Sequence, residues 1–371
     1  MKKIVCVLSA FILAFCFSAY VSAEDCSAAA AAVIGGQTQE LLWGKNSDTE
    51  LPMASTTKIM TALILCEEGG LEREITVTPE MVAVEGSSMG LLPGDRVTLH
   101  DLLYGMMLAS GNDAANTVAI TLGGSVSGFV AKMNERAMQM GLTHTHFETP
   151  SGLDSVGHYT TAYELAIIAA NALENKDFAA AASSKTATLC YGNPPYKRTL
   201  SNHNRLLKMY DDVVGVKTGF TKKSGRCLVS AAKSDGKTVI AVTLNDPNDW
   251  SDHRRLLDLG LSRLENVSLA PENITKTVRV IGGEKNAVDI DCPDIQICTV
   301  SPDTVSCDTV IMPFVFAPVD KGEKIGFVRC MQDGKILYEK PVTAAEGTKS
   351  KKIPSRSLFI TLLKNILVGL T

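Results

Sequence analysis

The order of strand-like and helical patterns constrains the fold of this chain more than any single motif does. Two strand-like runs, at 28–34 and 40–43, precede helical patterns that recur up to residue 173. Runs rich in β-branched residues then return, before a last helical pattern at 254–264. The three returning runs are 213–217, 227–232 and 238–244. Strands on both sides of a helical block predict an α/β fold of the α+β type, with an antiparallel sheet interrupted by a helical subdomain.

The pattern changes again after Pro271, where short β-like runs predict a small all-β, sandwich-like domain at 269–345. These runs are 276–281, 295–300, 310–316, 324–331 and 336–338. The α/β domain is then expected at 24–268, and a polar linker at 346–356. A chain of 371 residues with 45% hydrophobic composition has enough apolar material for both cores.

The first 23 residues have the pattern of a secretory signal peptide. Lys2 and Lys3 precede an apolar run that reaches about Ala19, and positions 21–23 supply the small residues of a cleavage site. Removing this segment, with its two lysines and no acids, changes the formal net charge from −4 to −6. An exported chain of this charge does not favour nucleic acid as a partner.

The last segment, 357–371, is an amphipathic helical pattern with its apolar side chains on one face. Five cations and no acids occur from residue 349 onward. The segment is too short and too interrupted to span a bilayer, so we expect an interfacial anchor attracted to an anionic membrane surface. The alternative is a terminal helix that packs on the β domain. With the signal peptide, an anchor predicts a peripheral protein at the extracytoplasmic face of the bacterial cell membrane.

Neither the cysteines nor the histidines form a metal-binding pattern. Eight of the ten cysteines remain after removal of the signal peptide, at irregular spacing and without C-x-x-C. Export permits disulfides, but the spacing does not determine their pairing. His144 and His146 alternate, yet the chain has no H-E-x-x-H motif. We therefore expect no metal and no cofactor.

One candidate nucleophile lies at the start of a strongly apolar segment. Ser55 and Lys58 are three residues apart, so on a helix that begins near Ser55 they share a face and can touch. Burial would lower the lysine pKa and make Lys58 a base for the serine. The alternative is an ordinary helix start, capped by Ser55, with Lys58 in solvent. A lone S-x-x-K is common by chance, so the choice depends on other motifs.

Two further motifs decide between these readings. Ser110 and Asn112 flank a glycine at a break between two helical patterns, where a hydroxyl and an amide can project into a cleft. Lys217, Thr218 and Gly219 end a predicted strand and would let a peptide lie along a sheet edge. Each motif alone could be an ordinary turn. In this order, S-x-x-K, S-x-N and K-T-G are the motif set of penicillin-binding proteins and class A β-lactamases.

The chain resembles the serine-type D-alanyl-D-alanine carboxypeptidases, which are low-molecular-mass penicillin-binding proteins of the β-lactamase-like superfamily. The resemblance extends to four further stretches, at 150–153, 158–160, 202–204 and 321–326. Signal peptide, catalytic domain, β domain and amphipathic tail also occur in that family in this order. The resemblance implies a β-lactamase/transpeptidase-like fold at 24–268 and an enzyme that removes the terminal D-alanine from peptidoglycan stem peptides.

The resemblance also implies roles for the motif residues. Ser55 would attack the carbonyl between two D-alanines, with Lys58 as the base, and a β-lactam would trap the same serine. Ser110 would relay a proton toward the leaving amine. The residues expected to bind substrate are Asn112, Lys217, Thr218 and Gly219. The backbone N–H groups of Ser55 and Phe220 would form the oxyanion hole.

Two positions differ from the family pattern. Phe220 follows K-T-G, where many relatives have histidine. Many relatives also place a carboxylate-binding arginine on the next segment, whereas 249–252 is Asp-Trp-Ser-Asp here, with Arg254 and Arg255 slightly later. Recognition of the substrate carboxylate is therefore the open point. We assign Trp43 and Trp250 to packing.

Two other functions were weighed. A class A β-lactamase needs a glutamate in an E-x-x-L-N context, and Glu164 with the residues after it does not match. An inactive cell-wall-binding homologue is disfavoured because every motif residue is intact. His158 and His203 are interpreted as structural groups near the cleft.

Overall fold

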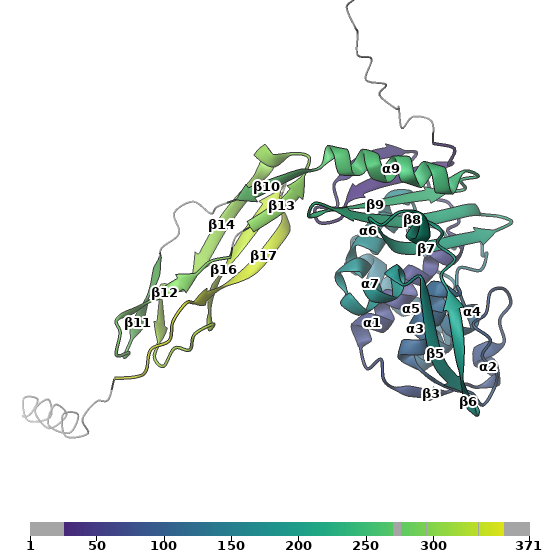
Figure 1. Ribbon diagram of the computed structural model, residues 1–371, viewed down its shortest axis with the longest axis horizontal. Helices are drawn as coiled ribbons and strands as arrows, with labels where there is room; N and C mark the ends of the chain where they lie inside the picture. The colour runs from purple at the N-terminus through teal and green to yellow at the C-terminus, as the bar shows by residue number, and fades with distance from the viewer. Residues whose placement is uncertain (1–25, 270–275, 294, 333, 352–371) are drawn as a thin grey trace, which may run out of the picture.

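The computed structural model describes residues 26–269, 276–293, 295–332 and 334–351, which form an α/β body and an elongated β body (Figure 1). The predicted signal peptide at 1–23 and the predicted anchor at 357–371 lie outside these residues. Within the described residues no single helix is long and apolar enough to cross a membrane. One pair of helices, bent by 85° between them, satisfies that criterion by length and composition only.

The α/β body is built on a five-stranded antiparallel sheet with the order β2-β1-β9-β8-β7. Its strands are β1 (Ala30–Gly35), β2 (Leu41–Lys45), β7 (Val213–Thr221), β8 (Gly225–Ser234) and β9 (Lys237–Leu244). All of β1 is buried, because alternate residues enter the cores on the two sides of the sheet. The predicted pairing of early and late strands in one sheet is confirmed.

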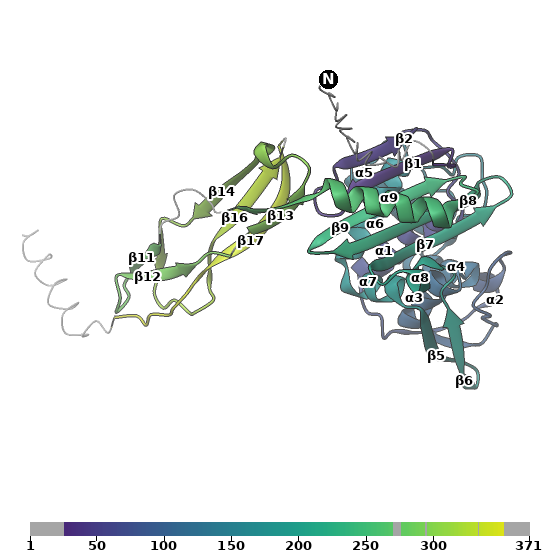
Figure 2. The ribbon, with the colours of Figure 1, turned by 45° about the horizontal axis from the view of Figure 1, so that its top comes forward.

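Helices cover both faces of this sheet. One face carries α9 (Asp249–Arg263), which lies across β9, β8 and β1 (Figure 2). The other face carries the helical block. Its longer helices are α1 (Lys58–Glu68), α3 (Leu99–Leu108), α4 (Asn112–Gly123), α5 (Val126–Gln139), α6 (Ala162–Glu174) and α7 (Lys176–Ser183). Two single-turn helices are α2 (Pro79–Val82) and α8 (Leu206–Met209).

The buried helix at the centre of this block is α1. Every residue from Lys58 to Cys66 is buried, the property of a helix that other elements surround on all sides. The helix ends at Gly69, whose φ of 73° is accessible to glycine at little cost. A 3₁₀ turn, η2 (Ala54–Thr57), precedes it. The helix predicted to begin near Ser55 therefore begins with this tighter turn.

The α/β body also contains a second sheet that the sequence patterns did not predict as a whole. A four-stranded sheet has the order β3-β4-β5-β6. Its strands are β3 (Glu74–Thr76), β4 (Arg96–Thr98), β5 (Thr186–Gly192) and β6 (Pro195–Ser201). Helix α9 begins at Asp249, earlier than the predicted start at Arg254, and acidic side chains in its first turn favour that start.

The second body is all β, as predicted. Its strands are β10 (Glu265–Leu269), β11 (Thr277–Ile281), β12 (Ala287–Asp291), β13 (Ile295–Thr299), β14 (Val305–Ile311), β15 (Phe314–Phe316), β16 (Lys324–Gln332) and β17 (Lys335–Ala344). They form a two-stranded sheet, β10-β13, and a six-stranded sheet, β14-β16-β17-β12-β11-β15. A 3₁₀ turn, η3 (Pro302–Thr304), precedes β14. A disulfide joins Cys307 to Cys330 across β14 and β16.

Glu40, just before β2, links the two bodies. Its carboxylate accepts hydrogen bonds from Thr299 Oγ1 (2.8 Å) and Gln332 Nε2 (2.7 Å) of the β body. The Cys298 N–H also donates to the side chain of Gln37 (3.2 Å). Polar contacts therefore connect the end of β13 to the turn between β1 and β2.

Candidate active site

Ser55 lies in the tight turn that leads into α1. Met53, not Ser55, is the N-terminal cap of this turn, and its side chain makes no capping hydrogen bond. Ala54 has a φ of 47°, a costly backbone conformation for a residue with a Cβ, and such residues cluster at active sites. Lys58, three residues later, is 0% exposed. The reading of S-x-x-K as a capped helix start with a solvated lysine is therefore wrong.

The Lys58 ammonium nitrogen has three partners within hydrogen-bonding distance. They are Ser55 Oγ (2.9 Å), Asn112 Oδ1 (2.7 Å) and the Ser151 carbonyl oxygen (2.6 Å). Amide and carbonyl oxygens only accept hydrogen bonds. A neutral lysine amine has two N–H groups and one lone pair, so those two oxygens take both N–H groups. The lone pair is then directed at the Ser55 hydroxyl, which is the geometry of a base.

The electrostatics favour that neutral amine. Burial holds the pKa of Lys58 well below its ordinary value, and the nearby charge of Lys217 lowers it further. Asp113 acts in the opposite direction, and more weakly. Burial also lowers the pKa of Lys217 to about 7. These effects favour Lys58 as the base that accepts the Ser55 proton.

The break between α3 and α4 positions Ser110 and Asn112, as the sequence predicted. Ser110 has a φ of 56°, a second non-glycine residue in the left-handed region at this site. Asn112 is the first residue of α4, and its Nδ2 donates to the Glu85 carbonyl oxygen (2.6 Å). This bond fixes the amide so that Oδ1 faces Lys58. The Glu85 and Ser151 carbonyls carry no side-chain signature, so sequence reasoning missed both.

The K-T-G residues end β7 beside Ser55. Lys217 is 1% exposed, and its Nζ donates to Ser110 Oγ (3.0 Å) and to the Thr218 carbonyl oxygen (2.9 Å). A Cβ on Gly219 would lie 3.1 Å from both the Ser55 nitrogen and the Met53 oxygen. Glycine thus lets β7 approach the nucleophile turn closely. The structure brings all the predicted site residues together at one place.

A cleft of about 730 Å³ opens at this place. Its predicted lining residues are Ser55, Ser110, Thr218, Gly219, Phe220 and His203. Its remaining lining residues, which the sequence did not assign to the site, are Ser87, Asn202, Arg205, Lys208, Arg226, Cys227, Asp249 and Trp250. Trp250 packs against the core beneath α9 but also faces the cleft, so its assignment to packing alone was incomplete.

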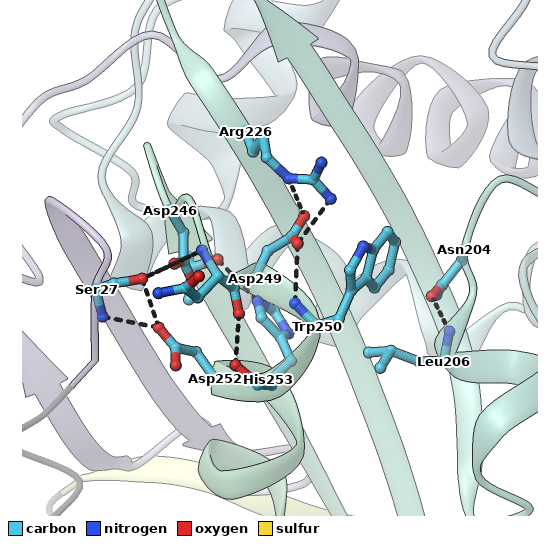
Figure 3. A network of polar contacts seen from close by, with 12 residues as sticks. Ser27, Asn204, Leu206, Arg226, Asp246, Asp249, Trp250, Asp252 and His253 are labelled. Atoms are coloured by element: carbon cyan, nitrogen blue, oxygen red, sulfur yellow. Dashed lines mark hydrogen bonds and ion pairs between the residues drawn. The ribbon is translucent and has the colours of Figure 1, made fainter.

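Arg226 and Asp249 form an ion pair at the wall of this cleft (Figure 3). Arg226 Nε and Nη2 donate to the two carboxylate oxygens, at 3.0 and 2.8 Å. Arg254 and Arg255, the cations nearest to the expected position of a carboxylate-binding arginine, do not line the cleft. Arg254 pairs with Asp212 and Asp258, and Arg255 pairs with Asp252.

His158 has a structural role, as interpreted from the sequence. The Glu148 N–H donates to His158 Nδ1 (2.9 Å), which leaves the proton of the neutral ring on Nε2, 2.7 Å from Thr57 Oγ1. Burial lowers the pKa of His158 to about 4, so the ring stays neutral at physiological pH. The histidine thereby braces the turn that carries Ser55.

Glu164 is also structural. It lies in the first turn of α6, and its carboxylate accepts hydrogen bonds from Thr143 N (2.8 Å), His144 N (3.0 Å) and Thr145 Oγ1. It does not line the cleft. This glutamate therefore has no contact through which it could activate a deacylating water.

Among the described residues, one group of side chains has the spacing of metal ligands. Candidate ligand atoms of Cys26, Asp246 and Asp252 lie within 4.8 Å of one another. The Ser27 hydroxyl lies within hydrogen-bonding distance of both carboxylates (Figure 3), and burial raises the pKa of the Cys26 thiol to about 11. The cluster thus connects the segment before β1 to Asp246 and to Asp252 of α9.

Comparison with known proteins identifies relatives of the whole arrangement. The family model described as D-alanyl-D-alanine carboxypeptidase matches residues 18–248. The carboxypeptidase DacF of Bacillus subtilis is 33% identical over 91% of this chain and 88% of its own length. A carboxypeptidase of Streptomyces sp. strain K15 is 36% identical over 62% of this chain and 88% of its own. Penicillin binding protein 5 of Haemophilus influenzae superposes with a TM-score of 0.63, at 27% identity, over 88% of this chain and 98% of its own.

Proposed function

The chain belongs to the D-alanyl-D-alanine carboxypeptidase family of serine peptidases, and we propose that Ser55 is its nucleophile. The enzyme removes the terminal D-alanine from peptidoglycan stem peptides, and β-lactams react with it as substrate mimics. The observation that supports Ser55 is the contact of its hydroxyl with a fully buried Lys58, whose other two partners can only accept hydrogen bonds.

In the acylation step Ser55 Oγ attacks the carbonyl between the two D-alanines, and Lys58 takes its proton. Backbone N–H groups of Ser55 and Phe220 stabilise the oxyanion, and such preorganised donors typically contribute about 3 to 4 kcal/mol. Ser110, held by Lys217, relays a proton to the leaving D-alanine nitrogen. The peptide bond breaks, free D-alanine leaves, and an ester to Ser55 remains.

In the second step water attacks that ester and restores the free serine, with Lys58 again as the base. Asn112 holds the substrate amide and orients Lys58. Thr218 and Lys217 hold the terminal carboxylate, and Gly219 lets β7 approach the turn that carries Ser55.

The enzyme acts outside the cytoplasm, where peptidoglycan lies. We propose that residues 1–23 direct export, that 24–268 form the catalytic domain and 269–345 the β domain, and that 346–356 link this to an anchor at 357–371. The support for the anchor is its cationic, amphipathic sequence. Deletion of 351–371 should release an active enzyme from membranes, and a truncated form that still sediments with membranes would refute the anchor.

The test of the catalytic proposal is intact-mass measurement after treatment with penicillin, for the wild type and for Ser55→Ala. The wild type should gain one persistent adduct and release D-alanine from a peptide that ends in D-Ala-D-Ala, and the variant should do neither. A rapidly lost adduct without D-alanine release would indicate a β-lactamase. Absence of any adduct would indicate an inactive wall-binding protein.

A further inference from the structure

The cleft wall next to the K-T-G strand contains an arginine with no role in the mechanism above. Arg226 lies on β8 directly opposite Phe220 of β7. Residues that face each other across an antiparallel pair project their side chains to the same side of the sheet. The side chains of Arg226 and Phe220 therefore project from the same face of the sheet, one residue beyond Gly219, and both line the cleft.

Two residues of α9 hold this guanidinium in one orientation. The Asp249 carboxylate, 5% exposed, accepts hydrogen bonds from Arg226 Nε and Nη2 in a bidentate ion pair (Figure 3). The Arg226 Cζ atom lies 5.6 Å from the centroid of the Trp250 ring. A paired, planar guanidinium is preorganised, since little side-chain freedom remains to be lost on binding. The Arg226 side chain nevertheless stays 43% exposed at the cleft.

The pairing leaves donors for a ligand. A guanidinium has five N–H groups, and the ion pair with Asp249 engages Nε and one of the two terminal nitrogens. Among the residues that the structure describes, none is hydrogen-bonded to Arg226 Nη1. These remaining N–H groups can meet a second carboxylate.

The substrate brings such a carboxylate, because its terminal D-alanine ends the peptide chain. Lys217 is poorly suited to hold it alone, since its ammonium is buried and donates to Ser110 Oγ and the Thr218 carbonyl. Burial also lowers the pKa of Lys217 to about 7, so part of its charge is lost at neutral pH. Arginine keeps its charge throughout this range.

We propose that Arg226, oriented by Asp249, binds the terminal carboxylate of the peptide substrate together with Thr218. The inference rests on the proposed function and adds a recognition residue to it. Asp249 is a positioning residue, which acts only through Arg226. Because Asp249 offsets much of the positive charge, the site depends on directed hydrogen bonds rather than on net charge, and a lysine at 226 should not replace the arginine.

Arg205 provides a matched control. It also lines the cleft, and its guanidinium lies on the same Trp250 ring, 5.9 Å from the centroid. No carboxylate of the described chain is within ion-pairing distance of Arg205, whereas Asp249 holds Arg226. If general positive charge in the cleft were sufficient, removal of either arginine would have the same effect.

The test compares kcat/KM for D-alanine-releasing peptides with a free terminal carboxylate and for the same peptides with a terminal amide. Arg226→Gln and Arg226→Lys should each lower kcat/KM for the free-carboxylate peptide by about 10- to 100-fold, the value of one or two lost hydrogen bonds to a charged group. Neither substitution should change kcat/KM for the terminal-amide peptide appreciably. Asp249→Asn should also lower kcat/KM selectively for the free-carboxylate peptide, but by a smaller factor than the Arg226 variants do. Arg205→Gln should keep the acid-to-amide ratio of the wild type.

Several outcomes would overturn the proposal. Equal losses of kcat/KM for the free-carboxylate and terminal-amide peptides in Arg226→Gln would mean that the ion pair only supports the fold. Thermal unfolding of each variant checks this independently. An acid-to-amide ratio of kcat/KM that is unchanged in Arg226→Gln, or one that falls in Arg205→Gln instead, would mean that another residue binds the carboxylate. If amide turnover is too slow to measure, Ser55 acylation by benzylpenicillin and by its methyl ester makes the same comparison. A wild type that releases no D-alanine would refute the proposed function itself, a result distinct from all of these.

Discussion

The substitution Asn112→Asp tests whether Lys58 must be uncharged to activate Ser55. It keeps the shape of the side chain and places a carboxylate where an amide oxygen now lies 2.7 Å from Lys58 Nζ. At an effective dielectric constant of about 20, opposite charges at that distance attract by roughly 6 kcal/mol. The cost of burying the new carboxylate, at a position only 4% exposed, offsets part of this attraction. We therefore expect the pKa of Lys58 to rise above its wild-type value.

The assay is the rate of Ser55 acylation by penicillin, followed by intact mass across a pH series. In the wild type the rate should decline as the pH falls through the pKa of Lys58, which burial and Lys217 hold well below its ordinary value. In Asn112→Asp the decline should begin at higher pH, so that the rate falls by about 100-fold at neutral pH and recovers in alkali.

The control is Asn112→Ala, which removes the amide without adding a charge. It should lower the rate without moving the pH profile. Both variants lose the hydrogen bond to the Glu85 carbonyl, at a cost of about 1 to 3 kcal/mol of stability that thermal unfolding will detect. An Asn112→Asp profile whose acid limb coincides with that of the wild type would refute Lys58 as the titrating base.

Two further predictions concern stability. Glu164→Ala removes the acceptor of three hydrogen bonds and should lower the free energy of unfolding by about 2 to 4 kcal/mol. The lifetime of the Ser55 acyl-enzyme should stay unchanged. A shortened or lengthened lifetime would contradict the structural role of Glu164. His253 is buried and neutral, with its pKa lowered by burial to about 3, so only the unfolded chain takes up its proton as the pH falls from about 6.5 to about 3. Stability should therefore decline through that window, by at most roughly 5 kcal/mol from this group. Denaturant titrations of His253→Asn should show a shallower decline.

The catalytic residues could be predicted because each lies in a short motif whose chemistry depends on local spacing. Ser55 and Lys58 are three residues apart, and their contact requires only a helical turn. The Ser151 carbonyl that orients the Lys58 amine, and the Glu85 carbonyl that orients Asn112, belong to loops distant in sequence, and a backbone oxygen leaves no trace in residue type. Burial of Lys58 could thus be expected, but the acceptors that orient its amine could not.

The arrangement around Arg226 was beyond sequence reasoning for a different reason. Its position depends on the register between β7 and β8, and on a helix that begins at Asp249 rather than at Arg254. The hairpin of β5 and β6 was missed because β6 is exposed along most of its length, which leaves little alternation of apolar and polar residues to detect. Helix and strand identities were predicted best where burial was most complete.

The pairing of β1 with β9 has a consequence for how this protein is made. Residues 30–35 leave the ribosome among the first of the mature chain, yet their partner on one side is residues 239–244, about two hundred residues later. Until that partner is synthesised, an apolar and alanine-rich strand has one bare edge, the kind of surface that aggregates. The sheet can close only after nearly the whole α/β body has emerged, so its folding is a late event, and an early segment must be kept unfolded in the meantime.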